Sequence, residues 1–149
     1  MARLLDSPKI EIFPQRSFAG LVRRYTMQIR TQIPAQWVAY NAMRSREAGA
    51  YYGVAFNFDP AMESFDYLCG QEGTSAEGFG LVTIEGAYAR FATSGHISTM
   101  QAVWEEVYTS WLQGGALRGR SGPSVEFYPP EFDGMAGTGG FEVWVPVQV

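Results

Sequence analysis

The pattern of apolar and polar residues divides the chain into two similar halves. Period-two alternation, which is typical of strands with one buried face, occurs in six segments: 10–26, 51–58, 63–69, 79–93, 124–128 and 140–147. Interruptions at 14–17 and at Glu85-Gly86 are expected to break the regularity of the two longest strands. The polar, glycine-containing stretch 70–80 is predicted to link the two halves.

Each half also contains one segment with helical periodicity. In 98–112, apolar residues recur at steps of three and four, which places them on one face of a helix. Residues 31–43 form a second predicted helix, with Pro34 in the first turn, where the missing backbone donor costs little. Ser98 and Thr31 are the expected N-cap residues of the two helices.

The two halves are an internal repeat. Trp37 and Trp104 follow their predicted N-caps by the same number of residues. We therefore expect one domain, 1–149, built from two strand-helix-strand-strand modules at about 8–72 and 76–149. Strands joined by hairpins pair antiparallel, so the predicted fold class is α+β: a mainly antiparallel sheet with two helices on one face and a pseudo-twofold.

Composition and charge limit the classes of protein that fit this sequence. Hydrophobic residues make up 46% of the chain and charged residues 17%, which is the composition of a globular domain. The net charge is -4 and there is no run of basic residues, so direct nucleic-acid binding is not expected. There is no unbroken apolar stretch of the length a signal peptide or membrane span needs, so we expect a cytoplasmic protein that is not bound to a membrane.

Metal, cofactor and triad chemistry are not indicated. The single cysteine, Cys69, cannot form an internal disulfide, and its spacing from the single histidine, His96, does not suit a zinc site. No metal and no cofactor are expected. His96 is interpreted as a loop or capping residue at the entrance of the second helix, so a Ser-His-Asp triad is not expected either.

Aromatic residues make up 15% of the chain, and two helices are too few to bury all of these rings against the sheet. Because ligand sites favour concave seams between packed units, we expect a groove between the two modules. Its expected aromatic lining is Tyr51, Phe56, Tyr88, Phe91, Trp104, Tyr108 and Trp144. The alternative is that most of these rings are core residues, as we expect for Trp111.

One carboxylate stands out among the strands. Alternation in 123–128 places Ser124, Glu126 and Tyr128 on one face and the intervening residues on the other. If the first set faces the helices, Glu126 is buried, at a cost of several kcal/mol unless it is paired or protonated. The alternative is an exposed Glu126 on the solvent face, and periodicity alone leaves both open.

These elements together resemble the GyrI-like small-molecule-binding domain, which also serves as the effector-binding domain of AraC-type and multidrug-responsive regulators. The resemblance is carried by residues 84–89, Gly95 and the Trp-bearing helix after it, Glu126, Tyr128, 143–147, Asp59-Pro60 and 65–69. It implies the tandem module fold and identifies Glu126 as the pocket acid. Because no helix-turn-helix segment fits before the first module, the chain resembles a stand-alone member.

The resemblance implies three classes of function. The first is multidrug-type binding, for sequestration or sensing, of lipophilic, aromatic, cationic small molecules in an aromatic groove around Glu126. The second is hydrolysis of strained cyclopropane-containing electrophiles, with Glu126 as general base and Tyr128 or Tyr88 as donor to the oxyanion. The third is inhibition of gyrase by direct contact. A small-molecule ligand is the expected partner, and a protein partner or a homodimer stays open.

Overall fold

The computed structural model describes residues 5–26, 28–42, 49–73 and 78–149. Its strands and helices run in the order β1 (Lys9–Thr26), α1 (Ile33–Ala42), β2 (Tyr51–Asp59), β3 (Ser64–Glu72), β4 (Gly80–Thr93), α2 (Met100–Glu106), β5 (Ser124–Tyr128) and β6 (Phe141–Pro146). Turns of 3-10 helix lead into α1 (Arg30–Gln32) and α2 (Ile97–Thr99), and a π-helical turn (Val107–Leu112) continues α2. The order strand, helix, strand, strand therefore occurs twice, as predicted.

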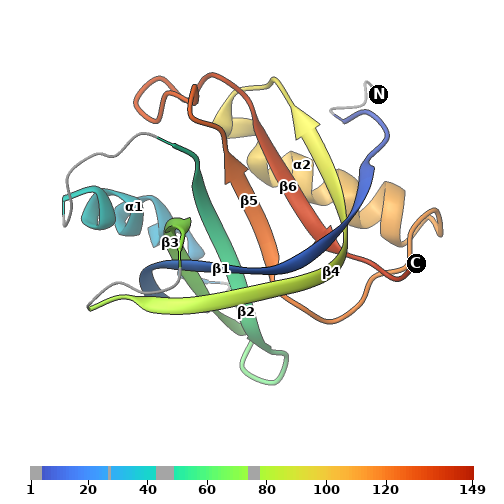
Figure 1. The fold of residues 1–149 in the computed structure, drawn as a ribbon, viewed down its shortest axis with the longest axis horizontal. Helices are drawn as coiled ribbons and strands as arrows, with labels where there is room; N and C mark the ends of the chain where they lie inside the picture. The colour runs from blue at the N-terminus through green and yellow to red at the C-terminus, as the bar shows by residue number, and fades with distance from the viewer. Residues whose placement is uncertain (1–4, 27, 43–48, 74–77) are drawn as a thin grey trace.

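The strands form an antiparallel sheet that closes on itself in the order β1-β3-β2-β5-β6-β4 (Figure 1). Each module supplies three neighbouring strands, β1-β3-β2 and β5-β6-β4. The modules meet at β2 with β5 and at β1 with β4, which are corresponding strands of the repeat. The predicted fold class is confirmed. Closure was not predicted, because it depends on β1 pairing with β3 and β4 at once.

The two predicted interruptions lie opposite each other in the sheet. The register of β1 against β4 shifts between Phe13 and Arg16, around Pro14, which has no backbone N–H to donate. Phe13 pairs with Gly86, whose φ of 97° is favourable only for glycine. The one extra residue in β1 bends the strand, and it places Arg16 opposite Ile84.

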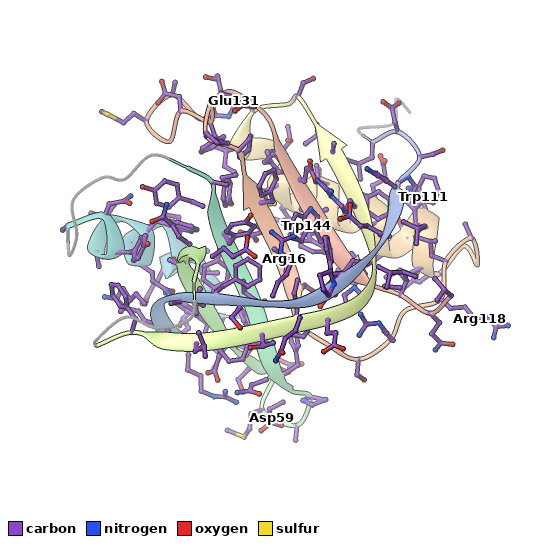
Figure 2. All side chains as sticks on the ribbon, viewed as in Figure 1. Arg16, Asp59, Trp111, Arg118, Glu131 and Trp144 are labelled. Atoms are coloured by element: carbon purple, nitrogen blue, oxygen red, sulfur yellow. The ribbon has the colours of Figure 1, made fainter. Side chains whose placement is uncertain are left out.

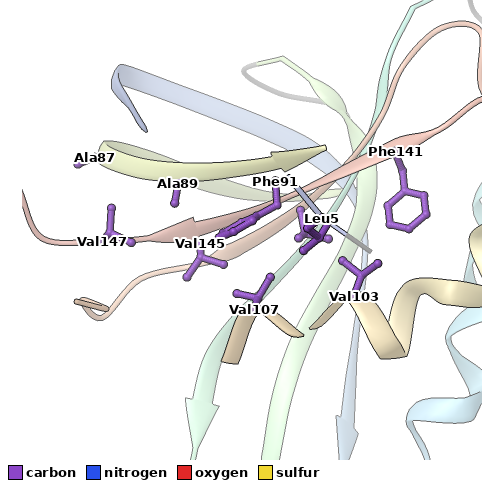
Figure 3. Close-up of a cluster of buried hydrophobic side chains, with 10 residues drawn as sticks. Leu5, Ala87, Ala89, Phe91, Val103, Val107, Phe141, Val145 and Val147 are labelled. Carbon is purple, nitrogen blue, oxygen red and sulfur yellow. The ribbon is translucent and has the colours of Figure 1, made fainter. Parts of the chain in front are cut away.

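Period-two alternation divides the core between the two faces of the sheet. The inner face, which the closed sheet surrounds, carries a cluster of buried residues: Phe13, Phe18, Tyr52, Val54, Leu68, Val82, Ile84, Tyr88, Val125 and Trp144. The outer face carries one cluster under α2, drawn in Figure 3, and another under α1. Both helices therefore cover the same face, as predicted.

The helices use corresponding positions to reach the sheet. From α2, Val103 and Val107 enter an apolar cluster with Ala89, Phe91 and Val145 (Figure 3).

From α1, Gln36 and Tyr40 are the buried residues at the matching places of the repeat. Gln36 accepts a hydrogen bond from the Tyr25 hydroxyl at 2.7 Å and donates to the carbonyls of Leu21 and Tyr67 at 2.8 Å each. Both helices are short, and among the described residues no helix has the length and apolarity needed to cross a membrane.

Two boundary predictions were wrong. The first concerns helix capping. His96, rather than Ser98, is the N-cap residue of the 3-10 turn that leads into α2, and its ring accepts a hydrogen bond from the Ser98 backbone N–H. This confirms the capping interpretation of His96. Thr99 is the N-cap of α2 itself, and its side chain makes no capping hydrogen bond. Thr31 lies inside the 3-10 turn before α1, and Met43, the predicted end of that helix, lies outside the described residues.

The second wrong prediction concerns the link between the modules. Gly70 and the two residues after it belong to β3 instead of a linker. A Cβ on Gly70 would lie 2.1 Å from the carbonyl oxygen of Ala19, and one on Gly20 would lie 1.9 Å from that of Cys69. Glycine at this position therefore permits close approach of β1 and β3 instead of marking a turn.

Candidate functional site

The candidate site lies on the outer face of the sheet, where β2 of one module pairs with β5 of the other. Val125 of β5 belongs to the inner cluster, and Phe127 packs against it. Alternation therefore places Glu126 and Tyr128 on the outer face, the face that the helices cover. The open question about Glu126 is thus decided by the fold. Its side chain is partly buried on the helix side of the sheet.

Two phenols hold the Glu126 carboxylate. Tyr67 of β3 donates to Oε1 at 2.6 Å, and Tyr128 of β5 donates to the same oxygen at 3.0 Å. Burial raises the pKa of Glu126, and hydrogen bonds from Tyr67, Tyr128 and Trp104 oppose that rise. Burial, together with the neighbouring carboxylate, also raises the pKa values of both phenols, so that they stay protonated donors.

Gly53 of β2 makes room for this arrangement. It pairs with Glu126 across the β2–β5 seam. A Cβ at Gly53 would lie 2.0 Å from the Tyr67 hydroxyl oxygen and 2.8 Å from Oε1 of Glu126. The absence of a side chain at this position therefore allows the phenol of Tyr67 to reach across β2 to the carboxylate on β5.

A tryptophan from each helix contacts the carboxylate or its donors. Trp37 of α1 donates from Nε1 to the Tyr67 hydroxyl at 3.2 Å, and its ring lies 5.5 Å from that of Tyr128. Trp104 of α2 lies near Glu126, where its indole N–H helps to oppose the rise in the pKa of that carboxyl. Trp37 directly follows the buried Gln36, and Trp104 directly follows the buried Val103, at corresponding places of the repeat. We call Glu126, Tyr67, Tyr128, Trp37 and Trp104 the Glu126 cluster.

The Glu126 cluster continues along α2 into a more exposed ring. Tyr108, at the start of the π-helical turn, stacks on Trp104 with 5.8 Å between ring centroids and 23° between planes. Its hydroxyl forms a hydrogen bond with Ser124 of β5. Tyr108 is 45% exposed, so it offers aromatic surface to solvent beside the buried part of the cluster.

The structure separates the predicted site residues into two groups. Glu126, Tyr128, Trp104 and Tyr108 lie together, and half-buried Tyr51 lies next to Gly53 on β2 and pairs with Tyr128.

The other four residues of the predicted lining lie elsewhere. Tyr88 and Trp144 are buried in the inner cluster, Phe56 packs against that cluster, and Phe91 is buried under α2. None of the four belongs to the Glu126 cluster. These four residues are core residues, the alternative stated above. The prediction grouped them with Trp104 because the sequence pattern does not separate rings on the two faces of the sheet. The suggested oxyanion role of Tyr88 is also wrong, since its hydroxyl donates to the carbonyl of Pro123 at 2.8 Å.

Two open hollows lie elsewhere on the surface. One, of about 370 Å³, is lined by residues at the ends of β4 and β5 and around the start of β6, including Phe127 and Glu142. The other, of about 480 Å³, adjoins the turn between β2 and β3. Neither includes Glu126. Trp111, expected in the core, packs against the cluster under α2 with its ring 5.5 Å from that of Phe91.

Two residues of the site were missed from the sequence. Tyr67 shares the outer face of β3 with Phe65 and Cys69, and this alternation was the only available signal. Gly53 carries no signal of its own, because its role depends on strand pairing.

Metal binding has no support in the described part of the chain, where no group of three or more His, Cys, Asp or Glu side chains is arranged to hold an ion.

Comparison with known proteins agrees with this architecture. None of the curated proteins matches the sequence. Among solved structures, an integron cassette protein from the mobile metagenome of Vibrio cholerae has a TM-score of 0.74 at 15% identity, with 97% of each chain covered. A putative transcription regulation protein from Staphylococcus aureus has a TM-score of 0.75 at 18% identity, covering 95% of this chain and 98% of that one.

A further solved structure, of a protein titled SAV2435, contains bound tetraphenylphosphonium. It has a TM-score of 0.74 at 19% identity and covers 96% of this chain and 94% of that one. Sequence identities this low show that the fold is shared and nothing further. The sequence itself matches the family described as Cass2, integron-associated effector binding protein, over residues 9–147. The chain is therefore a member of the Cass2 family of GyrI-like effector-binding proteins, and it is a small-molecule-binding domain.

Proposed function

We propose that this chain binds lipophilic aromatic cations at the Glu126 cluster, for sequestration or sensing. The observation that carries the proposal is a partly buried carboxylate that two phenols hold by hydrogen bonds, with a tryptophan from each helix beside it or its donors. Cations of several shapes fit this chemistry, because ring faces and one central charge do not require directional contacts from the ligand.

The charge balance of the cluster favours a cation. None of the described Lys or Arg residues forms an ion pair with Glu126. Burial disfavours the ionised carboxylate, and neutral donors offset only part of that cost. An organic cation would supply the missing positive charge without bringing a strongly hydrated group into the cluster.

The aromatic residues suit a large, weakly hydrated ligand. Trp37 of α1 and Trp104 of α2 contribute rings at the cluster, and Tyr108 stacks on Trp104. Each cation–π contact contributes about 0.5–1 kcal/mol when exposed and about 2 kcal/mol or more when desolvated. The structural neighbour that contains tetraphenylphosphonium supports this ligand class through the shared fold.

Titration with tetraphenylphosphonium, followed by calorimetry, tests the proposal. The Glu126→Gln variant keeps the shape of the side chain and removes its charge. Its affinity for tetraphenylphosphonium should fall more than about tenfold, which corresponds to about 1.4 kcal/mol. Triphenylphosphine oxide, a neutral aryl compound, should bind both proteins with similar affinity.

The exposed Glu131 provides the matched control, because Glu131→Gln removes the same charge outside the cluster and should leave both affinities unchanged. An unchanged tetraphenylphosphonium affinity in Glu126→Gln, or an equal loss for the neutral compound, would contradict the role of Glu126 as counter-charge.

A hydrolase of cyclopropane-containing electrophiles is the second candidate, because burial raises the pKa of Glu126 and so makes its carboxylate a stronger base. In that reaction Glu126 would activate water, and Tyr67 and Tyr128, already donors to Glu126, would be the nearest hydroxyls. The same variant separates the two functions. For a hydrolase, Glu126→Gln should abolish product formation, followed by chromatography, while substrate binding stays nearly unchanged.

A further inference from the structure

A second arrangement of rings and charge lies on the inner face of the sheet, opposite the Glu126 cluster. The guanidinium carbon of Arg16 lies 4.9 Å from the ring centroid of Phe13, 5.3 Å from Trp144, 5.8 Å from Phe18 and 5.9 Å from Tyr52. Figure 2 shows Arg16 beside Trp144 in the middle of the molecule. We call these four rings the Arg16 cage. Aromatic rings at such distances attract a cation through their negative faces.

Arg16 is held in the cage by contacts that solvent can reach. Its Nε and Nη2 donate to the two carboxylate oxygens of Glu72 at 3.0 and 2.9 Å, and Nη2 also donates to the Tyr52 hydroxyl at 3.2 Å. The side chains of Arg16 and Glu72 are 20% and 47% exposed. An ion pair this exposed contributes little to stability, because water and salt screen it.

The backbone at Arg16 is also less regular than its surroundings. The register shift in β1 ends at Arg16, so the residues just before it have no partner in the β4 register. The guanidinium therefore reaches the cage from the end of an irregular segment. The cage itself is made by side chains of β1, β2 and β6, of which Tyr52 and Trp144 belong to regular strand pairs.

The surroundings of the cage are negatively charged and adjoin open space. Trp144 donates from Nε1 to Glu142 at 2.8 Å, and Phe127 stacks on its ring with centroids 5.4 Å apart. Glu142 and Phe127 both line the hollow of about 370 Å³, which also includes Glu131. Arg90 also lies over the Trp144 ring, 5.1 Å from its centroid, and pairs with Glu11 and Glu142. The carboxylates named around the cage therefore outnumber the guanidinium groups.

We propose that the Arg16 cage is a second ligand site, for small organic cations of the guanidinium or alkylammonium class, and that Arg16 occupies it as a tethered competitor. In the absence of ligand the guanidinium of Arg16 fills the cage. A ligand cation takes its place when Arg16 gives up its contacts with Glu72 and Tyr52 and moves out into solvent. The site is separate from the Glu126 cluster, since the two lie on opposite faces of the sheet.

The test removes the tethered cation and supplies a free one. Arg16→Ala deletes the part of the side chain that ethylguanidinium replaces. Ethylguanidinium is titrated at constant ionic strength, and the indole N–H signal of Trp144 is followed by NMR after assignment with Trp144→Phe. We expect saturable shifts of the Trp144 signal and an affinity at least tenfold higher in Arg16→Ala than in the unmodified protein. Urea, a neutral analogue, should not shift the signal, and the Trp104 signal should not respond to ethylguanidinium.

A second variant keeps the test informative if Arg16→Ala does not fold. Glu72→Gln leaves Arg16 in place but removes its ion-pair partner, so ethylguanidinium should compete more effectively than in the unmodified protein. Two results would overturn the proposal. One is a folded Arg16→Ala whose Trp144 signal does not saturate, or whose affinity equals that of the unmodified protein. The other is a Glu72→Gln variant with no gain in affinity where Arg16→Ala cannot be measured.

Discussion

At the Glu126 cluster and at the Arg16 cage, a charge that lies among aromatic rings is compensated in different ways. Each combines a charged group with several aromatic rings, on opposite faces of one sheet. The charge of Arg16 is balanced by the carboxylate of Glu72. The charge of Glu126 receives hydrogen bonds from two neutral phenols. The charge of a group with an ion-pair partner is already neutralised. The charge of a group that has only neutral donors is not, and a ligand of opposite charge would stabilise it further.

The pKa shifts of the two carboxylates follow this difference. The hydrogen bond from Arg16 lowers the pKa of Glu72, so the ionised form of Glu72 stabilises the fold. Burial raises the pKa of Glu126, so ionisation of Glu126 costs stability. In the proposed function, this loss of stability leaves a charge that a ligand can pair with, which is the trade-off expected of a binding site.

The largest expected effect comes from filling the space that the Glu126 cluster needs. In Gly53→Ala, the new Cβ would overlap the Tyr67 hydroxyl and crowd Glu126, so both must move. The free energy of unfolding, measured in urea, should fall by roughly 1–3 kcal/mol. Tetraphenylphosphonium affinity should fall more than about tenfold, because the carboxylate loses its shortest hydrogen bond.

Gly73→Ala is the matched control for this prediction. Gly73 follows the end of β3, and a Cβ there would meet nothing within 4 Å. Stability and affinity should both be nearly unchanged. A Gly53→Ala protein that behaved like Gly73→Ala would show that the cluster does not depend on close contact between β2 and Tyr67.

Smaller changes in the free energy of unfolding, of opposite sign, should distinguish the carboxylates of Glu126 and Glu72. Glu126→Gln removes a buried charge that has no ion-pair partner among the described residues, and should raise the free energy of unfolding at neutral pH by about 1 kcal/mol. Glu72→Gln removes half of an exposed ion pair and should lower it by about 0.2–1 kcal/mol. Urea unfolding at neutral pH measures both, and changes of the same sign would remove the contrast between the two sites.

The smallest effect is the dependence of these differences on pH. Because the pKa of Glu126 is raised in the folded protein, the unmodified protein loses stability as pH rises from the unfolded value of 4.5 to the folded value. The advantage of Glu126→Gln should grow over that range and then level off. Because the pKa of Glu72 is lowered, its contribution is complete above 4.5 and is lost as pH falls through the folded value.

Urea unfolding of the three proteins from about pH 3 to about pH 8 tests these directions, with slopes of at most about 1.4 kcal/mol per pH unit for one proton. An advantage of Glu126→Gln that shrank as pH rose above 4.5 would contradict the raised pKa.

Local patterns in the sequence predict much of this molecule. Period-two alternation locates the six strands, and the repeat around Trp37 and Trp104 predicts two equivalent modules. These signals are local, because the periodicity of a strand or helix depends only on neighbouring residues. The same alternation correctly groups Glu126 with Tyr128.

Alternation separates two sets of side chains, but it does not say which set faces the helices. Phe56, Tyr88 and Trp144 were therefore assigned to the same groove as Trp104, although they lie on or against the inner face. Only the closed sheet, with β5 held between β2 and β6, decides which face is inner.

Tertiary structure alone brought the parts of the site together. Gly53 faces Glu126 because of the register between β2 and β5, and Tyr67 reaches the same carboxylate from β3. These contacts join residues far apart along the chain, and no pattern within a single strand encodes them. The sequence by itself determined the elements, the repeat and the residue types available for binding. The pairing of strands from the two modules decided which of them share a face, because that pairing depends on long-range packing of the whole chain.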